Sequence, residues 1–185
     1  MDSVRRNKEG ITPVLPLFKE IAQAKTVEEL KAFWDRHPFI SVGTLYGGGF
    51  GADAKNSEWN IYYASTAGLS LGQKEYYTET TKEAQDIRKK FKAHIERMFK
   101  LYGIKGAKKK AQLVYDLEMQ IADVSLTMVE RRDVEKRYNK MTLKEFSDRW
   151  PNIDITTGVK RKGVTDDCLK ELIVSNLKYF DWANK

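Results

Sequence analysis

The chain of 185 residues contains only two histidines and one cysteine, the side chains that most often bind zinc. The segment His94-Ile95-Glu96-Arg97-Met98 has one histidine but lacks the second that H-E-x-x-H requires at its fifth position. His37 precedes a proline, and neither histidine has a cysteine or carboxylate nearby at ligand spacing. The sequence therefore predicts no metal site in this chain alone. We expect His94 to flank the apolar face of a helix and His37 to lie at a helix C-terminus, where it favours the helix dipole.

Other segments resemble nucleophile or phosphate sites only in their letters. Gly68-Leu69-Ser70-Leu71-Gly72 matches Gly-x-Ser-x-Gly but does not sit between a core strand and a helix, so we interpret it as a bend. The run Gly47 to Gly51 leads into a strand rather than a helix, which excludes the Walker and dinucleotide loops and predicts a flexible hairpin loop. Cys168 is expected to be a small buried hydrophobe, since a catalytic thiolate needs a nearby base. No catalytic residue is predicted.

The first third of the chain reads as two short helices and a β-hairpin. One helix is predicted over Thr12–Gln23, and a second begins at the capping box Thr26-Val27-Glu28-Glu29 and must stop before Pro38. Strand-like runs follow at Phe39–Tyr46 and Glu58–Ala64. The segment between them, which holds the glycines, is expected to form a long loop.

The rest of the chain is predicted to be helical. Two long amphipathic helices, joined by a short turn, should form an antiparallel hairpin; their apolar positions are Ala84, Ile87, Phe91, Ile95, Met98 and Tyr102, then Val114, Leu117, Ile121, Val124 and Met128. A polar crossing segment spans Val129 to Lys140. A second capping box at Thr142 opens a short helix. A basic loop is expected over Gly158 to Gly163, and a last helix from Thr165 with Leu169, Leu172, Ile173 and Leu177 on one face.

Composition places the chain among globular proteins. Hydrophobic residues make up 41% and charged residues 32%, and no apolar run approaches the roughly 20 residues of a membrane helix. The charged segment Met1–Lys8 has no apolar stretch behind it, so no signal peptide is expected; either the chain is cytoplasmic or a native start has been removed. The aromatic ending Tyr179–Lys185 would normally pack on something, which favours a chain cut before its structural unit is complete.

Two segments resemble the neprilysin family of zinc metalloendopeptidases, which includes the endothelin-converting enzymes and oligoendopeptidase O. Gly68 to Tyr77 is similar to the family's Gly-Leu-Gly-Leu-Pro-x-Arg-Asp-Tyr-Tyr, with Gly72 for proline, Lys74 for arginine and Glu75 for aspartate. The segment 130–142 resembles its Arg-Asp-x-x-x-x-Tyr-Asn-Lys-Met-Thr, and 53–57 its Asp-x-Lys-Asn-Ser. The resemblance covers nearly the whole chain.

The resemblance implies a mainly α fold with a small β-hairpin, an incomplete lobe of a larger two-lobed enzyme. Residues 1–185 would be one incomplete domain, subdivided into 1–66, 67–129 and 130–185. The chain would help to wall a chamber that limits substrates to peptides, with no catalytic or metal-binding residue of its own. The residues expected to act as framework, through a buried Arg–Asp pair and Tyr/Asn hydrogen bonds to the helix hairpin, are Tyr76, Tyr77, Arg132, Asp133, Tyr138 and Asn139.

The same resemblance implies the enzyme's wider setting. In the complete enzyme, a zinc-bound water would attack the peptide carbonyl with a glutamate as general base. The partners would be the remaining catalytic lobe and peptide substrates, without nucleic acid, and the location would be extracytoplasmic. We expect this chain alone to be inactive, marginally stable and quickly proteolysed.

The net charge of +7 keeps a different class of function open. A stand-alone basic helical module could bind an acidic partner or nucleic acid through Lys105 to Lys110 and the predicted loop at Gly158 to Gly163. That basic run otherwise reads as a solvated surface turn. A third interpretation is an inactive regulator that kept only the non-catalytic lobe.

Overall fold

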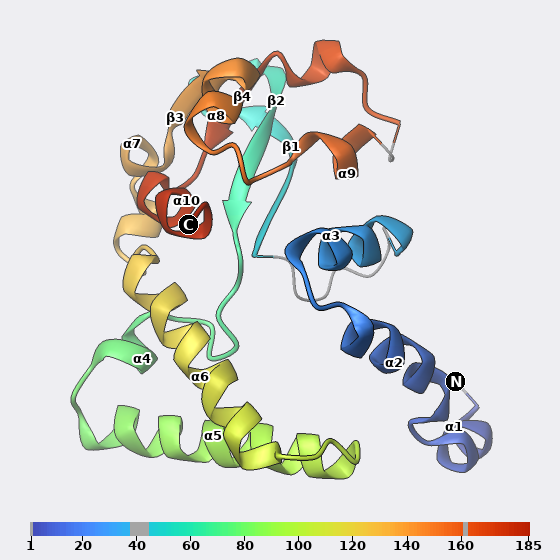
Figure 1. Ribbon diagram of the computed structural model, residues 1–185. Helices are drawn as coiled ribbons and strands as arrows, with labels where there is room; N and C mark the ends of the chain where they lie inside the picture. The colour runs from blue at the N-terminus through green and yellow to red at the C-terminus, as the bar shows by residue number, and fades with distance from the viewer. Residues whose placement is uncertain (1, 38–44, 161–162) are drawn as a thin grey trace. The chain divides into compact units, whose positions relative to one another are not determined.

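The computed structural model describes residues 2–37, 45–160 and 163–185, and it divides into two compact units, Met1–Val42 and Gly43–Lys185 (Figure 1). Most of the strand predicted at Phe39–Tyr46 falls outside the described residues. Over the described ranges, none of the helices has the length and apolar character needed to cross a membrane. The predicted class is confirmed: the chain is mainly helical, with one small sheet.

The first unit is helical. It contains α1 (Ser3–Glu9), the 3-10 helix η1 (Thr12–Val14), α2 (Leu15–Gln23) and α3 (Val27–Arg36). The capping box at Thr26 is present as predicted: its side chain accepts from the Glu29 N–H, and the Glu29 carboxylate accepts in return from the Thr26 N–H.

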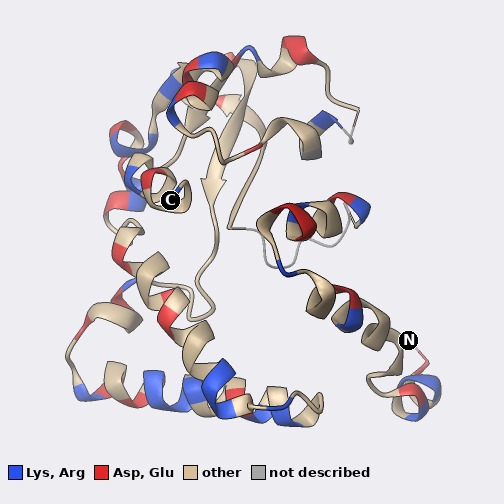
Figure 2. Ribbon diagram, in the orientation of Figure 1, with Lys and Arg blue, Asp and Glu red and all other residues tan. Residues whose placement is uncertain are grey.

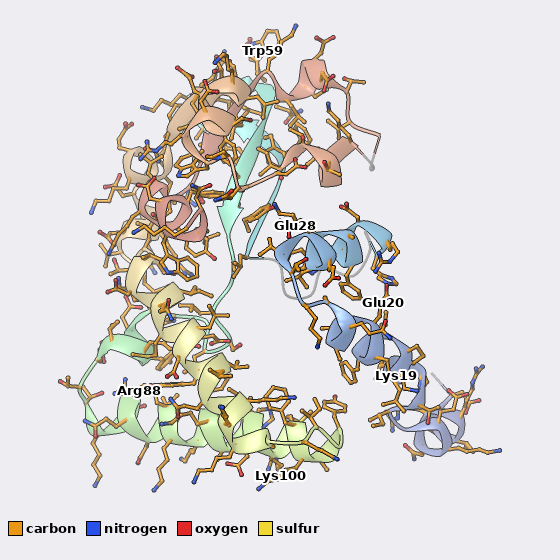
Figure 3. All side chains as sticks on the ribbon, viewed as in Figure 1. Lys19, Glu20, Glu28, Trp59, Arg88 and Lys100 are labelled. Atoms are coloured by element: carbon orange, nitrogen blue, oxygen red, sulfur yellow. The ribbon has the colours of Figure 1, made fainter. Side chains whose placement is uncertain are left out.

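The helices α2 and α3 are joined through Glu20, which is labelled in Figure 3. Its carboxylate accepts hydrogen bonds from Arg36 at 2.6 Å and from the imidazole of His37 at 2.8 Å. The bond with His37, followed by that with Arg36, lowers the pKa of Glu20. His37 therefore ends α3, as predicted, but its ring is used in a contact between helices.

The second unit is built on a four-stranded sheet in the order β1-β2-β4-β3. Its strands are β1 (Tyr46–Asp53), β2 (Asn56–Thr66), β3 (Asn139–Thr142) and β4 (Glu171–Val174). β1 and β2 form an antiparallel hairpin, β2 pairs parallel with β4, and β4 pairs antiparallel with β3.

The long glycine-rich hairpin loop was a wrong prediction. Gly47, Gly48, Gly49 and Gly51 all lie within β1, and the hairpin turns tightly at Ala54 and Lys55. Gly48 leaves space for a large side chain of the partner strand. A Cβ on Gly48 would stand 2.2 Å from the Tyr62 hydroxyl oxygen and 2.5 Å from the Tyr63 carbonyl oxygen.

The predicted last helix was also wrong. Residues Asp166–Leu169 form a 3-10 helix, η3, and Glu171–Val174 form the strand β4. Leu172, Ile173 and Val174 are all fully buried, because β4 is a central strand. A short, continuous apolar run of this kind is compatible with either a buried strand or a helix. The final helix, α10 (Leu177–Ala183), follows it and is capped by Asn176.

Two further local predictions differ from the structure. The segment predicted as a basic loop contains the end of α9 (Thr156–Lys160), and its residues 161–162 lie outside the described ranges. Cys168 is exposed in η3, not buried in an amphipathic helix.

The helix hairpin is present close to its predicted position. α5 (Lys82–Leu101) and α6 (Ala107–Val124) are joined by a short turn, and α6 doubles back across α5 (Figure 1). Gly103 and Gly106 adopt positive φ angles of 70° and 72° in that turn, which glycine allows at little cost. Because α6 ends at Val124, Met128 lies beyond it, and Leu117 is 42% exposed rather than on the buried face.

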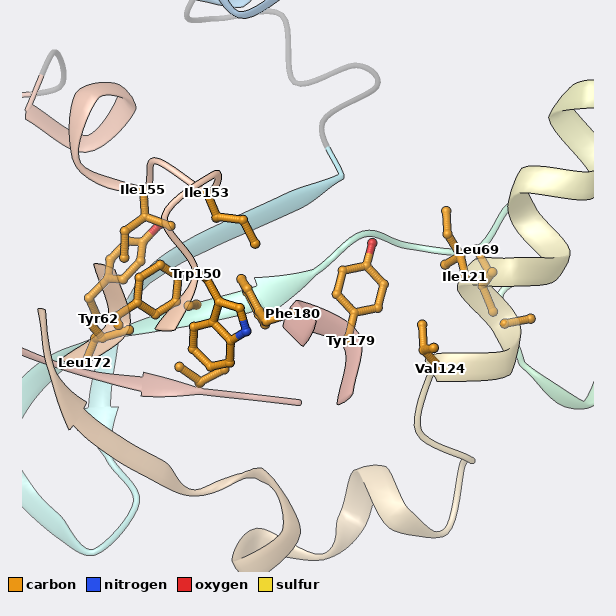
Figure 4. Packing of buried hydrophobic residues seen from close by; sticks show 14 of the residues in the cluster. Tyr62, Leu69, Ile121, Val124, Trp150, Ile153, Ile155, Leu172, Tyr179 and Phe180 are labelled. Carbon is orange, nitrogen blue, oxygen red and sulfur yellow. The ribbon is translucent and has the colours of Figure 1, made fainter. Parts of the chain in front are cut away.

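The core of the second unit lies where the sheet meets the C-terminal helices (Figure 4). Phe146 and Trp150, on and just after α8 (Leu143–Arg149), pack edge to face at a centroid distance of 4.9 Å. Phe180 of α10 packs on both and is fully buried. The aromatic ending of the chain thus packs into the chain's own core, contrary to the expectation that its partner was missing.

Candidate functional site

The first motif, Gly68 to Tyr77, is held on the α5–α6 hairpin through Glu118 of α6. The Glu118 carboxylate accepts hydrogen bonds from the Ser70 hydroxyl, from the Ser70 N–H at 3.3 Å and from the Tyr77 hydroxyl. The Tyr77 oxygen in turn accepts from the Leu71 N–H at 3.1 Å. Burial, and then the bond to Glu118, raise the pKa of Tyr77, which keeps the phenol protonated and able to donate.

The two charged residues of the same motif hold the end of α6. The Lys74 ammonium donates to the carbonyl oxygens of Asp123 at 2.7 Å and Ser125 at 3.1 Å. A cation beside the last carbonyls of a helix also complements the helix dipole. The Glu75 carboxylate accepts from the Met128 N–H at 3.1 Å. Lys74 and Glu75 therefore fix the backbone on both sides of the point where α6 ends.

A third set of contacts holds α4 (Glu75–Thr78) against α5. The Arg88 guanidinium donates to the carbonyl oxygens of Tyr76 at 2.9 Å, Tyr77 at 3.2 Å and Glu79 at 2.8 Å. Tyr76 is half-buried and packs on the core, and Tyr77 is only 2% exposed. The first motif, which follows β2 in the chain, is thus fixed to both helices of the hairpin.

The second motif meets the β-hairpin at Asp53, whose side chain is buried. The Tyr138 hydroxyl donates to one carboxylate oxygen at 3.1 Å, and the Lys55 N–H donates to the other at 2.9 Å. The Lys140 ammonium lies 3.6 Å from Asp53 and 2.9 Å from Glu171. The bond from Lys55, then that from Tyr138, outweigh burial and lower the pKa of Asp53, so this carboxylate is the anionic centre of the cluster.

The other residues of the second motif lie differently from the prediction. Asn139 donates to the Val174 carbonyl at 2.8 Å, within the sheet. Arg132 and Asp133 are both exposed, so the expected buried pair is not present. Asp133 instead caps the short helix α7 (Val134–Arg137), accepting from the backbone N–H groups of Glu135 and Lys136. Tyr138 and Asn139 contact strands, not the helix hairpin.

A buried asparagine connects α6 to the C-terminal helix. Asn176 donates through its side-chain amide to the Val124 carbonyl at 2.8 Å and accepts from the Tyr179 N–H at 3.1 Å. The Tyr179 hydroxyl donates to the Leu45 carbonyl at 2.5 Å. Helix α10 is thereby bonded to both α6 and the segment before β1.

Sequence reasoning missed Glu118, Arg88 and Asn176 as functional framework residues. Glu118 did carry a signal, since it falls between Val114 and Ile121 on the buried face of α6, where a carboxylate needs a partner. Arg88 and Asn176 bond to backbone carbonyls, which side-chain patterns do not reveal.

Among the described residues, no three His, Cys, Asp or Glu side chains form a group that could hold a metal ion. His94 is exposed on α5, and its ring contacts Arg97 at 3.0 Å. Ser70 lies in a turn, with its hydroxyl bonded to Glu118. The side-chain hydrogen bonds of half-buried Glu118 and of buried Asp53 and Asn176 instead fix helices and strands to one another.

Comparison with known proteins identifies the family to which this framework belongs. The family model described as peptidase family M13 matches residues 1–185, and the chain is a member of that family, matching its N-terminal region. Mouse endothelin-converting enzyme-like 1 is 27% identical over 115 residues, which are 61% of this chain and 15% of that protein. Guinea pig endothelin-converting enzyme 1 is 27% identical over 132 residues, 70% of this chain and 17% of that protein. The resemblance to the neprilysin family is therefore confirmed.

The fold is shared with a solved bacterial enzyme. The Mycobacterium tuberculosis zinc metalloprotease Zmp1, in complex with an inhibitor, matches with a TM-score of 0.85 and 24% identity. The match covers 99% of this chain and 28% of that chain. This chain thus spans less than a third of the proteins that it resembles.

Proposed function

We propose that this chain forms non-catalytic framework in a neprilysin-like zinc metallopeptidase and helps to wall the chamber in which peptides are cleaved. The observation that carries the proposal is the family match over all 185 residues. In addition, the described residues of the two motifs hold helices and strands together, and the described residues form no group that could hold a metal ion. The described side chains form no group that could hold a catalytic zinc. Zinc and the general base would come from a catalytic lobe of the same protein.

Within this proposal, the framework residues are those that join the motifs to the fold. Tyr77 and Tyr138 each donate to a carboxylate, Glu118 and Asp53, from a segment far away in sequence. Tyr76 and Asn139 contribute through backbone or sheet contacts. The proposed role of Asp133 is local, through the cap of α7, and Arg132 ends the 3-10 helix Glu130–Arg132 just before it. Residues 1–185 would be part of one larger domain, and the complete enzyme would work outside the cytoplasm.

The test compares the complete protein with the 185-residue chain in the hydrolysis of fluorogenic peptides, with and without a zinc chelator. We expect the complete protein to cleave short peptides but not folded proteins, to lose activity with the chelator and to regain it with zinc. The 185-residue chain should be inactive under all conditions. A complete reading frame without H-E-x-x-H, or metal-dependent cleavage by the 185 residues alone, would contradict the proposal. The comparisons do not favour a stand-alone binding module.

The proposals about domain and location have separate tests. If the domain is completed by further chain, the 185 residues alone should bind an apolar dye and be digested faster than the same region in the complete protein. Equal protection in both forms would show that the two units fold independently of the rest. Fractionation of the source cells, with a cytoplasmic marker protein as control, tests the extracytoplasmic location.

A further inference from the structure

Positive charge is concentrated on the α5–α6 hairpin. Residues 82–110 contain eleven Lys and Arg and three Asp and Glu, a net charge of +8, whereas the whole chain carries +7. The other 156 residues together therefore carry a charge of −1. Figure 2 shows the basic residues along α5 and at the start of α6. The net positive charge of the protein therefore comes from the segment 82–110.

Most of these cations have no partner, among the residues that the structure describes, that would explain them. Three of the basic side chains are used internally: Arg88 bonds to carbonyls, Lys92 lies over the Tyr115 ring at 4.8 Å, and Lys100 pairs with Glu96 at 2.6 Å. Seven exposed lysines form no ion pair with any other described residue; they are Lys82, Lys89, Lys90, Lys105, Lys108, Lys109 and Lys110. We call these seven residues the basic face.

The basic face opposes the stability of the helix that it begins. The N-cap residue of α6 is Gly106, which offers no side-chain cap, and the first turn has no acidic residue and carries three consecutive lysines. Cations at this end repel the positive pole of the helix dipole. Their placement is therefore not explained by folding, and it points to an external anion.

Exposed apolar side chains lie beside these cations. Leu101, the last residue of α5, is 67% exposed and follows Lys100, whose side chain extends away from the helix pair in Figure 3. Leu113 is 59% exposed and stands one helical turn after Lys109 and Lys110. Lysines beside exposed leucines on a helix are typical of segments that lie on a membrane surface.

We propose that the basic face, with Leu101 and Leu113, binds the surface of an anionic phospholipid bilayer. The α5 helix, of 20 residues, extends for about 30 Å and presents Lys82, Lys89 and Lys90 toward solvent, which suits an extended anionic surface. The leucines distinguish a bilayer from nucleic acid, since they would enter the region between headgroups and acyl chains. The phosphate and carboxylate groups of the lipids would complement the lysines.

The test is co-sedimentation of the 185-residue chain and of the complete protein with two kinds of vesicle. One kind is phosphatidylcholine alone, and the other contains about a third of phosphatidylserine. Each basic residue near an anionic lipid surface strengthens binding by about a factor of five. We expect both proteins to bind the phosphatidylserine vesicles only. Binding should weaken when the ionic strength rises from about 0.1 M to about 1 M, where the Debye length falls to about 3 Å.

Matched variants separate the basic face from total charge. Replacing Lys89, Lys90 and Lys109 by glutamine should lower binding about a hundred-fold. The control replaces three lysines outside the face, Lys8, Lys19 and Lys185, and should bind nearly as the wild type does, although the net charge changes equally. Equal loss in both variants, or no binding by the complete protein, would overturn the proposal.

A second variant separates lipid from other anions. Replacing Leu101 and Leu113 by glutamine should weaken vesicle binding while leaving weak binding to polyglutamate unchanged. Tighter binding to a single-stranded oligonucleotide or to polyglutamate than to vesicles would assign the face to a nucleic acid or an acidic protein instead. Circular dichroism of each variant ensures that a loss of binding is not a loss of fold.

Discussion

The hydroxyl of Tyr77 should be a main determinant of how firmly the first motif is held on α6, and Tyr77→Phe removes only that hydroxyl. The side chain is 2% exposed, so the ring remains packed as before. Two hydrogen bonds disappear: the donation to Glu118 and the acceptance from the Leu71 N–H. The substitution therefore measures the polar part of this joint.

The magnitude follows from the two bonds. A hydrogen bond to a charged group contributes about 1.5–3 kcal/mol, and leaving a buried N–H without an acceptor costs about 1–3 kcal/mol. Glu118 is half-buried and keeps its bonds from Ser70. The free-energy cost of losing the bond between Tyr77 and Glu118 should therefore be at the low end of the first range. We expect the free energy of unfolding to fall by about 2–3 kcal/mol, which moves the urea midpoint by about 1 M at an m-value of about 2–3 kcal/mol/M.

The matched control is Tyr115→Phe on α6. Its ring contact with Lys92 is kept, and no hydrogen bond of its hydroxyl to another described residue is present, so the change should stay within about 0.5 kcal/mol. Urea unfolding followed by tryptophan fluorescence measures both variants. Equal stabilities of the two would refute the role of the Tyr77–Glu118 bond.

The pH dependence gives an independent check. Because the pKa of Tyr77 is raised in the folded state, its contribution is complete below the ordinary tyrosine pKa of 10.0 and is lost as the pH rises beyond it. The wild type should therefore lose more stability than Tyr77→Phe above pH 10. Parallel pH profiles would contradict this assignment.

Three further substitutions test other parts of the fold. Gly48→Ala should destabilise by about 1–3 kcal/mol, because the new Cβ meets the Tyr62 hydroxyl at 2.2 Å, whereas Gly49→Ala, with nothing within 4 Å, should be nearly neutral in thermal unfolding. Glu130→Gln should make the free energy of unfolding fall less steeply as the pH is lowered. The Thr127 N–H and then Lys136 lower the pKa of Glu130 to about 2, so its contribution is present above 4.5 and lost toward pH 2; an unchanged slope would contradict this. Phe180→Ala should cost about 3–5 kcal/mol in urea unfolding, and a cost under about 1 kcal/mol would show that this ring is not part of the core.

The features that could be predicted from sequence are local. The capping boxes at Thr26 and Thr142 involve residues three apart and form as expected. The two long helices follow from their 3.6-residue period and from the glycines between them. The resemblance identified the family because its motifs are themselves short segments.

The features that failed depend on distant partners. The strand β4 is buried because β2 and β3 flank it, and nothing within Leu172–Val174 distinguishes it from a helix. Gly48 of β1 is explained only by Tyr62 and Tyr63 of the neighbouring strand β2. Tyr138 and Asp53 are 85 residues apart, and Tyr77 and Glu118 are 41 apart, so neither pairing could be read from the sequence.

The two motifs are connected through the interior of the second unit. The first bonds to α6 at Glu118, and α6 ends at Val124, whose carbonyl accepts from Asn176. Asn176 lies two residues after the end of β4, and the last residue of β4, Val174, accepts from Asn139 in the second motif. A chain of hydrogen bonds therefore joins the helix hairpin to the sheet, and the two motifs are held in it by partly buried bonds. The proposed role as part of a chamber wall requires such fixed geometry.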